Sequence, residues 1–168
     1  MLVKIFRSTC VLALAVGLSL SSAMAAAPAI GKPAPPLARA DVSGHRVDLA
    51  ALRGKVVLLN FWATWCAPCQ AEIPAFVAWQ SQFASQGLQV VGVSMDDEQA
   101  QVLHYLVRHK LNYPVVMGDG KLGEAYGGVD GLPITFLIDR QGKIRAEFKG
   151  ETDINRILGQ LKPLLAQR

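Results

Sequence analysis

The chain has 168 residues, with 17 Lys and Arg against 13 Asp and Glu and a formal net charge of +4. A chain of this length forms one domain with its own hydrophobic core, so its 3 cysteines are not required as structural disulfides. The charges are scattered, without the basic run that would follow a phosphate backbone, so we do not expect a nucleic acid partner.

The first 25 residues have the layout of a secretory signal peptide. Lys4 and Arg7 precede an apolar run over 10–20, and Ala23-Met24-Ala25 resembles a cleavage site. An uncleaved membrane anchor is the alternative, because weakly apolar residues continue to Ile30. In either case we expect the domain outside the cytoplasm, for example in the periplasm. Loss of Lys4 and Arg7 reduces the 17 basic residues to 15 against 13 acids, or +2.

The folded domain is expected over 37–168, after a linker at 26–36 (AAPAIGKPAPP) that is rich in Ala and Pro and lacks periodicity. The pattern around Ser43-Gly44 predicts two short strands that form a β-hairpin at the start of the domain, followed by a brief turn at 50–54. The apolar run KVVLLNFWA at 55–63 then predicts a strand buried on both faces.

A helix is expected over 67–86, where apolar residues recur at helical spacing and Pro74 introduces a kink. LQVVGVS at 88–94 predicts a second buried strand, and the next helix is expected over 97–110. That helix should bury one apolar side, formed by Val102, Leu103, Leu106 and Val107. Strand, helix and strand in this order predict a right-handed crossover between parallel strands.

The last part of the domain contains a short extended piece at 113–117 and a third apolar strand, ITFLID, after Gly131-Leu132-Pro133. Gln141-Gly142 should turn this strand into an antiparallel partner, KIRAEFKG, and a helix over 154–165 ends the domain. The elements together predict an α/β fold with a mixed central sheet and helices on both faces.

Cys66 and Cys69 form a Cys-x-x-Cys pair. A structural zinc site needs four ligands, and the chain lacks the other two. The chain has no second Cys-x-x-Cys, and His45 is best explained as a turn residue. His104 and His109 are separated by about 140° on a helix that turns roughly 100° per residue, so they should not share a face. Cys10 lies in the signal segment and is expected to be only an apolar residue. We therefore expect no metal and no cofactor.

A reactive dithiol explains the pair better. Cys66 follows a strand and starts a helix, where free amides and the helix dipole favour a thiolate. Such positions lower a cysteine pKa from about 8.5 to roughly 3.5–7.5. Cys69, one turn inside the helix, should be the shielded resolving thiol, whereas Cys66 should be the exposed nucleophile. Pro68 fits the first turn because it needs no N–H there.

With these features the sequence resembles the secreted, thioredoxin-fold thiol–disulfide oxidoreductases of the TlpA and ResA type, within the AhpC/TSA-redoxin superfamily. The resemblance runs from about Leu37 to the C-terminus. It depends on FWATWCAPC, on Glu72 and Pro74 after it, on an insertion-like connection over 90–117, and on GLPITFLIDRQGKI. The resemblance implies a thioredoxin-like fold with an N-terminal hairpin and a central βα insertion.

The resemblance also implies roles for the site residues. Cys66 attacks, Cys69 resolves, and Pro133 is a cis-proline that faces them. The backbone of Leu132 could then pair with an extended substrate segment. Trp65 is expected on the rim beside Cys66 as an apolar contact, and Trp62 in the core. Pro68 is expected to contact the substrate as well.

The proton chemistry should differ from that of cytoplasmic thioredoxins, which carry a buried aspartate in the strand before the motif. Asn60 stands at that position here and cannot exchange a proton. Glu72 lies three residues beyond Cys69, on the same helix face, and the TlpA and ResA branch uses a glutamate there. Glu72 is therefore the expected proton acceptor, with a solvated surface acid as the alternative.

We expect an extracytoplasmic, monomeric enzyme that most readily reduces disulfides in exported proteins. By the resemblance, its electrons come from a membrane-embedded thiol donor, and apocytochrome c is a client during cytochrome c maturation. Three alternatives stay open at this point: a disulfide-forming oxidant, a thiol peroxidase, and a binding module or metallochaperone without turnover. The spacing of Thr64 and Cys66 does not match the threonine-x-x-cysteine pocket of the peroxidases.

Overall fold

A five-stranded sheet forms the centre of the domain in the computed structural model, which describes residues 29–167. Its strand order is β5-β4-β3-β6-β7. The strands are β3 (Val56–Trp62), β4 (Leu88–Ser94), β5 (Val115–Met117), β6 (Ile134–Ile138) and β7 (Ile144–Lys149). β3, β4 and β5 run parallel, whereas β6 is antiparallel to both β3 and β7. The predicted mixed sheet and parallel β3–β4 pair are confirmed.

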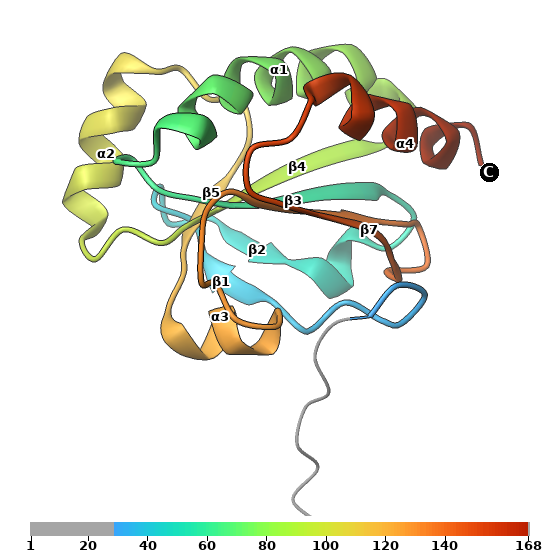
Figure 1. Ribbon diagram of the computed structural model, residues 1–168, viewed down its shortest axis with the longest axis horizontal. Coiled ribbons are helices and arrows are strands. Elements are labelled where there is room, and N and C mark those ends of the chain that lie inside the picture. The colour runs from blue at the N-terminus through green and yellow to red at the C-terminus, as the bar shows by residue number, and fades with distance from the viewer. Residues whose placement is uncertain (1–28, 168) are drawn as a thin grey trace, which may run out of the picture.

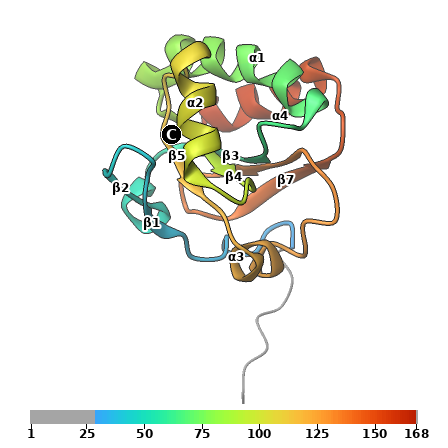
Figure 2. The same cartoon turned by 90° about the vertical axis from the view of Figure 1, so that its left-hand side faces the viewer.

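Helices and a hairpin cover the two faces of this sheet (Figures 1 and 2). One face carries α1 (Ala67–Phe83), α2 (Gln99–Arg108) and α4 (Ile154–Ala166). The opposite face carries the hairpin of β1 (Ala38–Ala40) and β2 (Arg46–Asp48), together with α3 (Gly120–Ala125). The predicted α/β fold class, its N-terminal hairpin and its central insertion are therefore confirmed.

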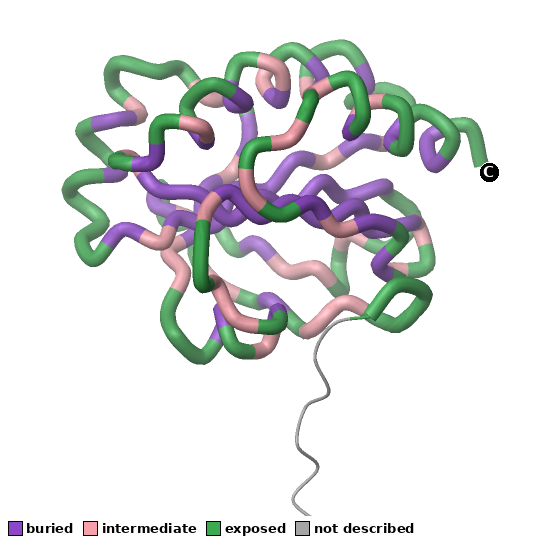
Figure 3. Tube along the Cα trace, viewed as in Figure 1, coloured by how far each residue is buried: buried purple, intermediate pink, exposed green. Residues whose placement is uncertain are grey.

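Alternation along β3 divides its side chains between two hydrophobic clusters. Val56, Leu58 and Trp62 join the cluster under α1 and α4, whereas Val57, Leu59 and Phe61 join the cluster on the hairpin side. All seven residues of β3 are buried, as a continuous apolar run predicts for a central strand, and the sheet is the most buried part of the trace (Figure 3). This rigid strand ends four residues before Cys66.

The buried side of α2 differs from the predicted one. Val102 is buried as expected, but the other main contact is Tyr105, whose ring lies 5.1 Å from that of Trp62. Leu103 and Val107 were predicted to be buried and are exposed by 42% and 79%. Leu106 is partly buried against the same core cluster, so the prediction was wrong for Leu103 and Val107 only. It followed the apolar residues, whereas the helix also buries its aromatic one, which fills the space beside the indole.

The helix α3 was not predicted from the sequence. Asp119 caps it by accepting a hydrogen bond from the N–H of Leu122 at 2.7 Å, and Arg39 pairs with the same carboxylate at 2.7 Å. Leu122 and Tyr126 then pack into the hairpin-side cluster. With six residues, two of them glycine, this segment has too short an apolar pattern to predict a helix.

Part of the segment expected to be a linker is attached to the domain. The N–H of Gly31 donates to the carbonyl of Ile144 at 2.7 Å, and the N–H of Ala34 donates to the carbonyl of Gly142 at 2.9 Å. Ordered contacts therefore begin before Leu37. The predicted signal peptide, 1–25, lies outside the described residues. No helix within 29–167 combines the length and apolar character needed to cross a membrane.

Candidate active site

The two cysteines lie at the junction of β3 and α1 and form a disulfide, so the structure represents the oxidised state. Cys66 is the N-cap of α1, and its sulfur accepts a hydrogen bond from the N–H of Cys69 at 3.3 Å. Pro68 occupies the first turn of the helix, as predicted. A free amide aimed at the sulfur is the arrangement that stabilises a thiolate at a helix N-terminus.

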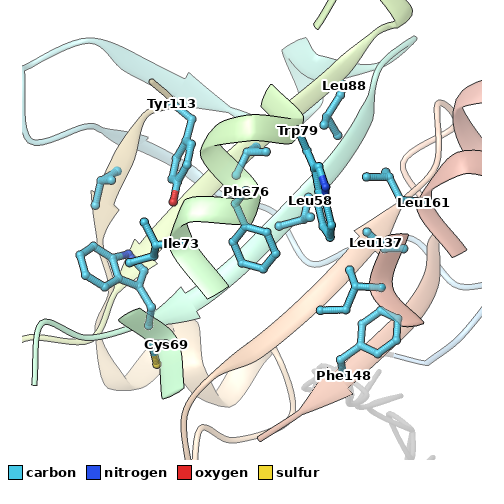
Figure 4. Close-up of a cluster of buried hydrophobic side chains, with 14 of the residues drawn as sticks. Leu58, Cys69, Ile73, Phe76, Trp79, Leu88, Tyr113, Leu137, Phe148 and Leu161 are labelled. Carbon is cyan, nitrogen blue, oxygen red and sulfur yellow. The ribbon is translucent and has the colours of Figure 1, made fainter. Parts of the chain in front are cut away.

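Cys66 is less accessible than the sequence suggested, whereas Cys69 is shielded as predicted. Cys66 is 5% exposed and Cys69 1%. The order agrees with the predicted nucleophile and its shielded partner, but the predicted exposure of Cys66 is wrong for the disulfide state. Cys69 continues the buried row of α1, with Ile73, Phe76 and Trp79 behind it (Figure 4).

The loop before Cys66 is held by a residue that sequence reasoning missed. Asp96, buried just after β4, accepts hydrogen bonds from the N–H of Thr64 at 3.2 and 3.0 Å and from its hydroxyl at 2.6 Å. The hydroxyl of Ser94 donates to the same carboxylate at 2.7 Å. Gln70 fixes the other side of Thr64 by donating to its carbonyl. An acid two residues after a largely apolar strand was the available signal.

Glu72 lies on the buried face of α1, one turn after Cys69, as its spacing predicted. Both carboxylate oxygens are buried, and neither forms a hydrogen bond within 29–167. Burial raises its pKa from the ordinary 4.5 to about 7, the nearby N–H of Thr152 opposes this without reaching a regular hydrogen bond, and Glu151 adds to it. A carboxyl with such a pKa exchanges protons near neutral pH, so Glu72 is not a solvated surface acid.

Asn60 has a structural contact instead. Its side-chain amide donates to the hydroxyl of Thr135 on β6 at 3.0 Å, and both residues are buried. This hydrogen bond joins β3 to β6 beneath the active site. An amide has no acidic proton at physiological pH, so Asn60 does not exchange protons with the dithiol.

The remaining predicted site residues gather at the same edge of the sheet. The pairing of Phe61 with Ile134 sets the start of β6 beside the end of β3, and the preceding Leu132–Pro133 bond is cis, as predicted. Pro133 is buried and Leu132 half-buried. Trp65 is 69% exposed, whereas Trp62 is in the core, and both outcomes agree with the prediction.

The two histidines of the insertion are both exposed, as predicted, but they line one groove. His109 follows the last residue of α2 with an extended backbone, and its ring stacks on Tyr105 at 4.1 Å. The predicted 140° separation assumed that the helix continues through His109, so it does not describe these two side chains. Within the part of the chain that the structure describes, no three or more His, Cys, Asp or Glu side chains group as metal ligands would.

The comparisons with known proteins agree with this geometry. Residues 30–147 match the model of the AhpC/TSA family. The thiol-disulfide oxidoreductase ResA of Bacillus subtilis is 36% identical over 137 residues, which cover 79% of this chain and 76% of that protein.

Two solved structures are also similar. A thiol:disulfide interchange protein of the thioredoxin family from Chlorobium tepidum matches with a TM-score of 0.74 and 33% identity, over 83% of this chain and 100% of that one. A secreted thiol-disulfide isomerase from Corynebacterium glutamicum matches with a TM-score of 0.72 and 25% identity, over 79% and 85% of the two chains. The chain therefore belongs to the AhpC/TSA family and is one of its thioredoxin-fold, ResA-like thiol–disulfide oxidoreductases.

Proposed function

We propose that this oxidoreductase reduces disulfides in exported proteins outside the cytoplasm. The observation that carries the mechanism is Glu72, a buried carboxyl without a hydrogen bond and with a pKa of about 7, one helical turn after Cys69. A group with this pKa can accept a proton and release it again near neutral pH. It supplies what a resolving cysteine needs, because the thiolate and not the thiol attacks a disulfide.

The reaction proceeds in two exchanges. The Cys66 thiolate attacks one sulfur of the substrate disulfide, a bond forms between them, and the other substrate sulfur leaves as a thiolate. Cys69 then gives its proton to Glu72 and attacks the Cys66 sulfur, which forms the intramolecular disulfide and releases the second substrate sulfur. The substrate gains two electrons and the enzyme dithiol loses them. A dithiol donor of the membrane then reduces the enzyme again.

Three features around the dithiol support contact with an extended substrate segment. Neither the N–H nor the carbonyl of Leu132 takes part in a hydrogen bond among the described residues, so both are free for a substrate backbone. Pro68 is half-buried beside the cysteines, and Trp65 offers a largely exposed indole. Backbone pairing beside an apolar contact is how strand addition combines affinity with specificity.

The location and the client follow from the N-terminal segment and the family. Residues 1–25 have the pattern of a signal peptide that is cleaved or kept as an anchor. One similar structure is titled a secreted thiol-disulfide isomerase. Apocytochrome c, whose cysteines must be reduced before haem attachment, is the client that we propose, and the enzyme acts as a monomer without a cofactor.

The direction of the reaction is tested by the reduction potential of the dithiol. The Ala67-Pro68 pair favours the reducing end, so we expect a value closer to the roughly −270 mV of thioredoxin than to the roughly −120 mV of a disulfide-forming oxidant. The measurement is equilibration with glutathione buffers, followed by insulin reduction. A potential near the oxidant value would reverse the proposed direction.

The roles of the two cysteines are tested by alkylation and trapping. In the reduced protein, iodoacetamide at neutral pH should label Cys66 first, and Cys69→Ser should accumulate mixed disulfides with exported proteins. Preferential labelling of Cys69 would exchange the two roles. Peroxide turnover and bound-metal analysis of the same preparation test the peroxidase and metallochaperone alternatives.

A further inference from the structure

A groove of about 400 Å³ lies between the active-site loop and α2. Thr64 and Gln70 line it on the side of the dithiol, and Gln101, His104, Tyr105, Arg108 and His109 line it on the side of α2. In both ribbon views α2 lies beside the N-terminal end of α1 (Figures 1 and 2). Thr64 is two residues before Cys66 and Gln70 directly follows Cys69, so the groove borders the segment that carries the disulfide, although neither cysteine lines it.

The charge of this groove has one sign. Arg108 contributes a positive charge, and none of the lining residues is an acid. The nearest buried acid, Asp96, uses its oxygens to bind Thr64 and Ser94. A groove that is lined by basic and amide side chains, with no acidic side chain among them, favours an anionic occupant.

Trp65, next to the groove residue Thr64, is a large apolar side chain on the active-site loop and is exposed by 69%. Leu103 and Val107 are exposed by 42% and 79% on another side of α2, outside the groove. An exposed aromatic side chain beside a polar groove is typical of surfaces that bind other proteins.

The groove and the Leu132 backbone lie on opposite sides of the dithiol. Cys66 follows β3, which is flanked by β4 on one side and by β6 on the other. The groove belongs to α2, which follows β4, whereas Leu132 precedes β6. A segment that pairs with Leu132 can therefore cross the cysteines and continue into the groove.

We propose that this groove binds an acidic, extended segment of a protein partner, a few residues from the cysteine that reacts with Cys66. The proposal rests on the proposed function and adds that partners with an acidic segment are preferred. Glu or Asp of the partner pairs with Arg108, and an apolar neighbour packs against Trp65.

The test uses two disulfide-bonded peptides that differ only in having Glu or Gln three residues from one cysteine. Reduced full-length protein is mixed with each peptide in stopped flow, at low and high salt. The variants are Arg108→Glu, the milder Arg108→Gln, and Lys55→Glu as a control with the same change in charge. Lys55 is exposed at the opposite end of β3. A small aromatic disulfide reports the chemistry of the dithiol alone.

The wild type should reduce the acidic peptide faster than the neutral one, by roughly threefold to tenfold at low salt, and salt should weaken the preference. Arg108→Gln should remove most of the preference, Arg108→Glu should invert it, and Lys55→Glu should keep it. All proteins should reduce the small disulfide equally. Two results would contradict the proposed binding of an acidic segment in the groove. One is a wild type that reduces the small disulfide but shows no preference between the peptides. The other is an Arg108→Glu variant that loses the same rate on both peptides. Failure of the wild type with every disulfide overturns the proposed function, and the groove with it.

Discussion

Two buried carboxylates lie on the segments next to the active-site dithiol, and they differ in their hydrogen bonds. Asp96, after β4, is 4% exposed and accepts hydrogen bonds from the N–H and hydroxyl of Thr64 and from the hydroxyl of Ser94. Glu72, on α1, is 5% exposed and accepts none. The two side chains are equally removed from water, so the difference between them comes from their partners.

This difference separates anchoring from proton transfer. A buried carboxylate that accepts several hydrogen bonds is stabilised as an ion and holds its donors in place. A buried carboxyl without donors favours its neutral form and changes charge near neutral pH, as the raised pKa of Glu72 indicates. One acid thus fixes the loop before Cys66, and the raised pKa of the other suits the proton transfer that we propose for it.

The largest expected effect is that of removing the anchor. Asp96→Ala leaves the N–H and hydroxyl of Thr64 and the hydroxyl of Ser94 without their acceptor in a buried site. We expect the oxidised protein to lose about 3–5 kcal/mol of unfolding free energy, measured by denaturant titration at pH 7. The control is Asp119→Ala, which removes a surface helix cap and should cost only about 1 kcal/mol. Equal losses would mean that Asp96 is no more than another cap.

The second effect is a pH-dependent gain from removing the charge of Glu72. Its pKa in the folded state, about 7, exceeds its ordinary 4.5, so folding favours the protonated form. The stability that this carboxyl contributes is complete below pH 4.5 and is lost as the pH rises through 7. Glu72→Gln mimics the protonated form and should stabilise the oxidised protein above pH 7, by about 3 kcal/mol at most and roughly 2 after screening by solvent.

The measurement for Glu72 is the unfolding free energy of wild type and Glu72→Gln from pH 4 to pH 9. The two curves should coincide at the acid end and separate between pH 4.5 and 7. Glu124→Gln, at an exposed position on α3, is the matched control. Parallel curves for Glu72→Gln would show that the carboxyl does not titrate in this range and would remove the contrast with Asp96.

A third effect concerns the reduced dithiol. A negative charge at Glu72 raises the pKa of neighbouring thiols, so Glu72→Gln should lower their apparent pKa by about one unit, equivalent to about 1.4 kcal/mol. Resolution by Cys69 should slow at the same time, because its proton acceptor is gone. Thiolate absorbance against pH and single-turnover kinetics measure the two changes. If both results match the wild type, Glu72 is not the acceptor and the proton leaves through water.

Sequence patterns predicted one of these two carboxylates and missed the other for a physical reason. Glu72 is three residues from Cys69, and helical spacing alone brings them to one face. Asp96 meets Thr64 across 32 residues, through the parallel pairing of β3 with β4. Continuous apolar runs predicted those strands, but nothing in them specifies which loop donates to which acid.

Local sequence patterns also gave wrong predictions where contacts with distant residues decide which side chain is buried. The apolar residues of α2 predicted the wrong buried side, because Tyr105 packs against Trp62 and turns Leu103 and Val107 outward. His109 was misplaced because α2 ends at Arg108. In both cases the outcome depends on neighbours that are distant in sequence and on where a helix stops, which spacing cannot supply.

The smallest effect on stability is expected at Trp65, between the anchored Thr64 and the reactive Cys66. Its side chain is 69% exposed, so Trp65→Ala should change the unfolding free energy by no more than about 0.5 kcal/mol. Reduction of a protein disulfide should nevertheless slow more than reduction of a small one, because the indole contacts the substrate and not the core. Denaturant titration and parallel assays with insulin and a small disulfide measure this. If Trp65→Ala destabilises the protein as strongly as Asp96→Ala, then Trp65 supports the loop, and Asp96 does not hold it alone.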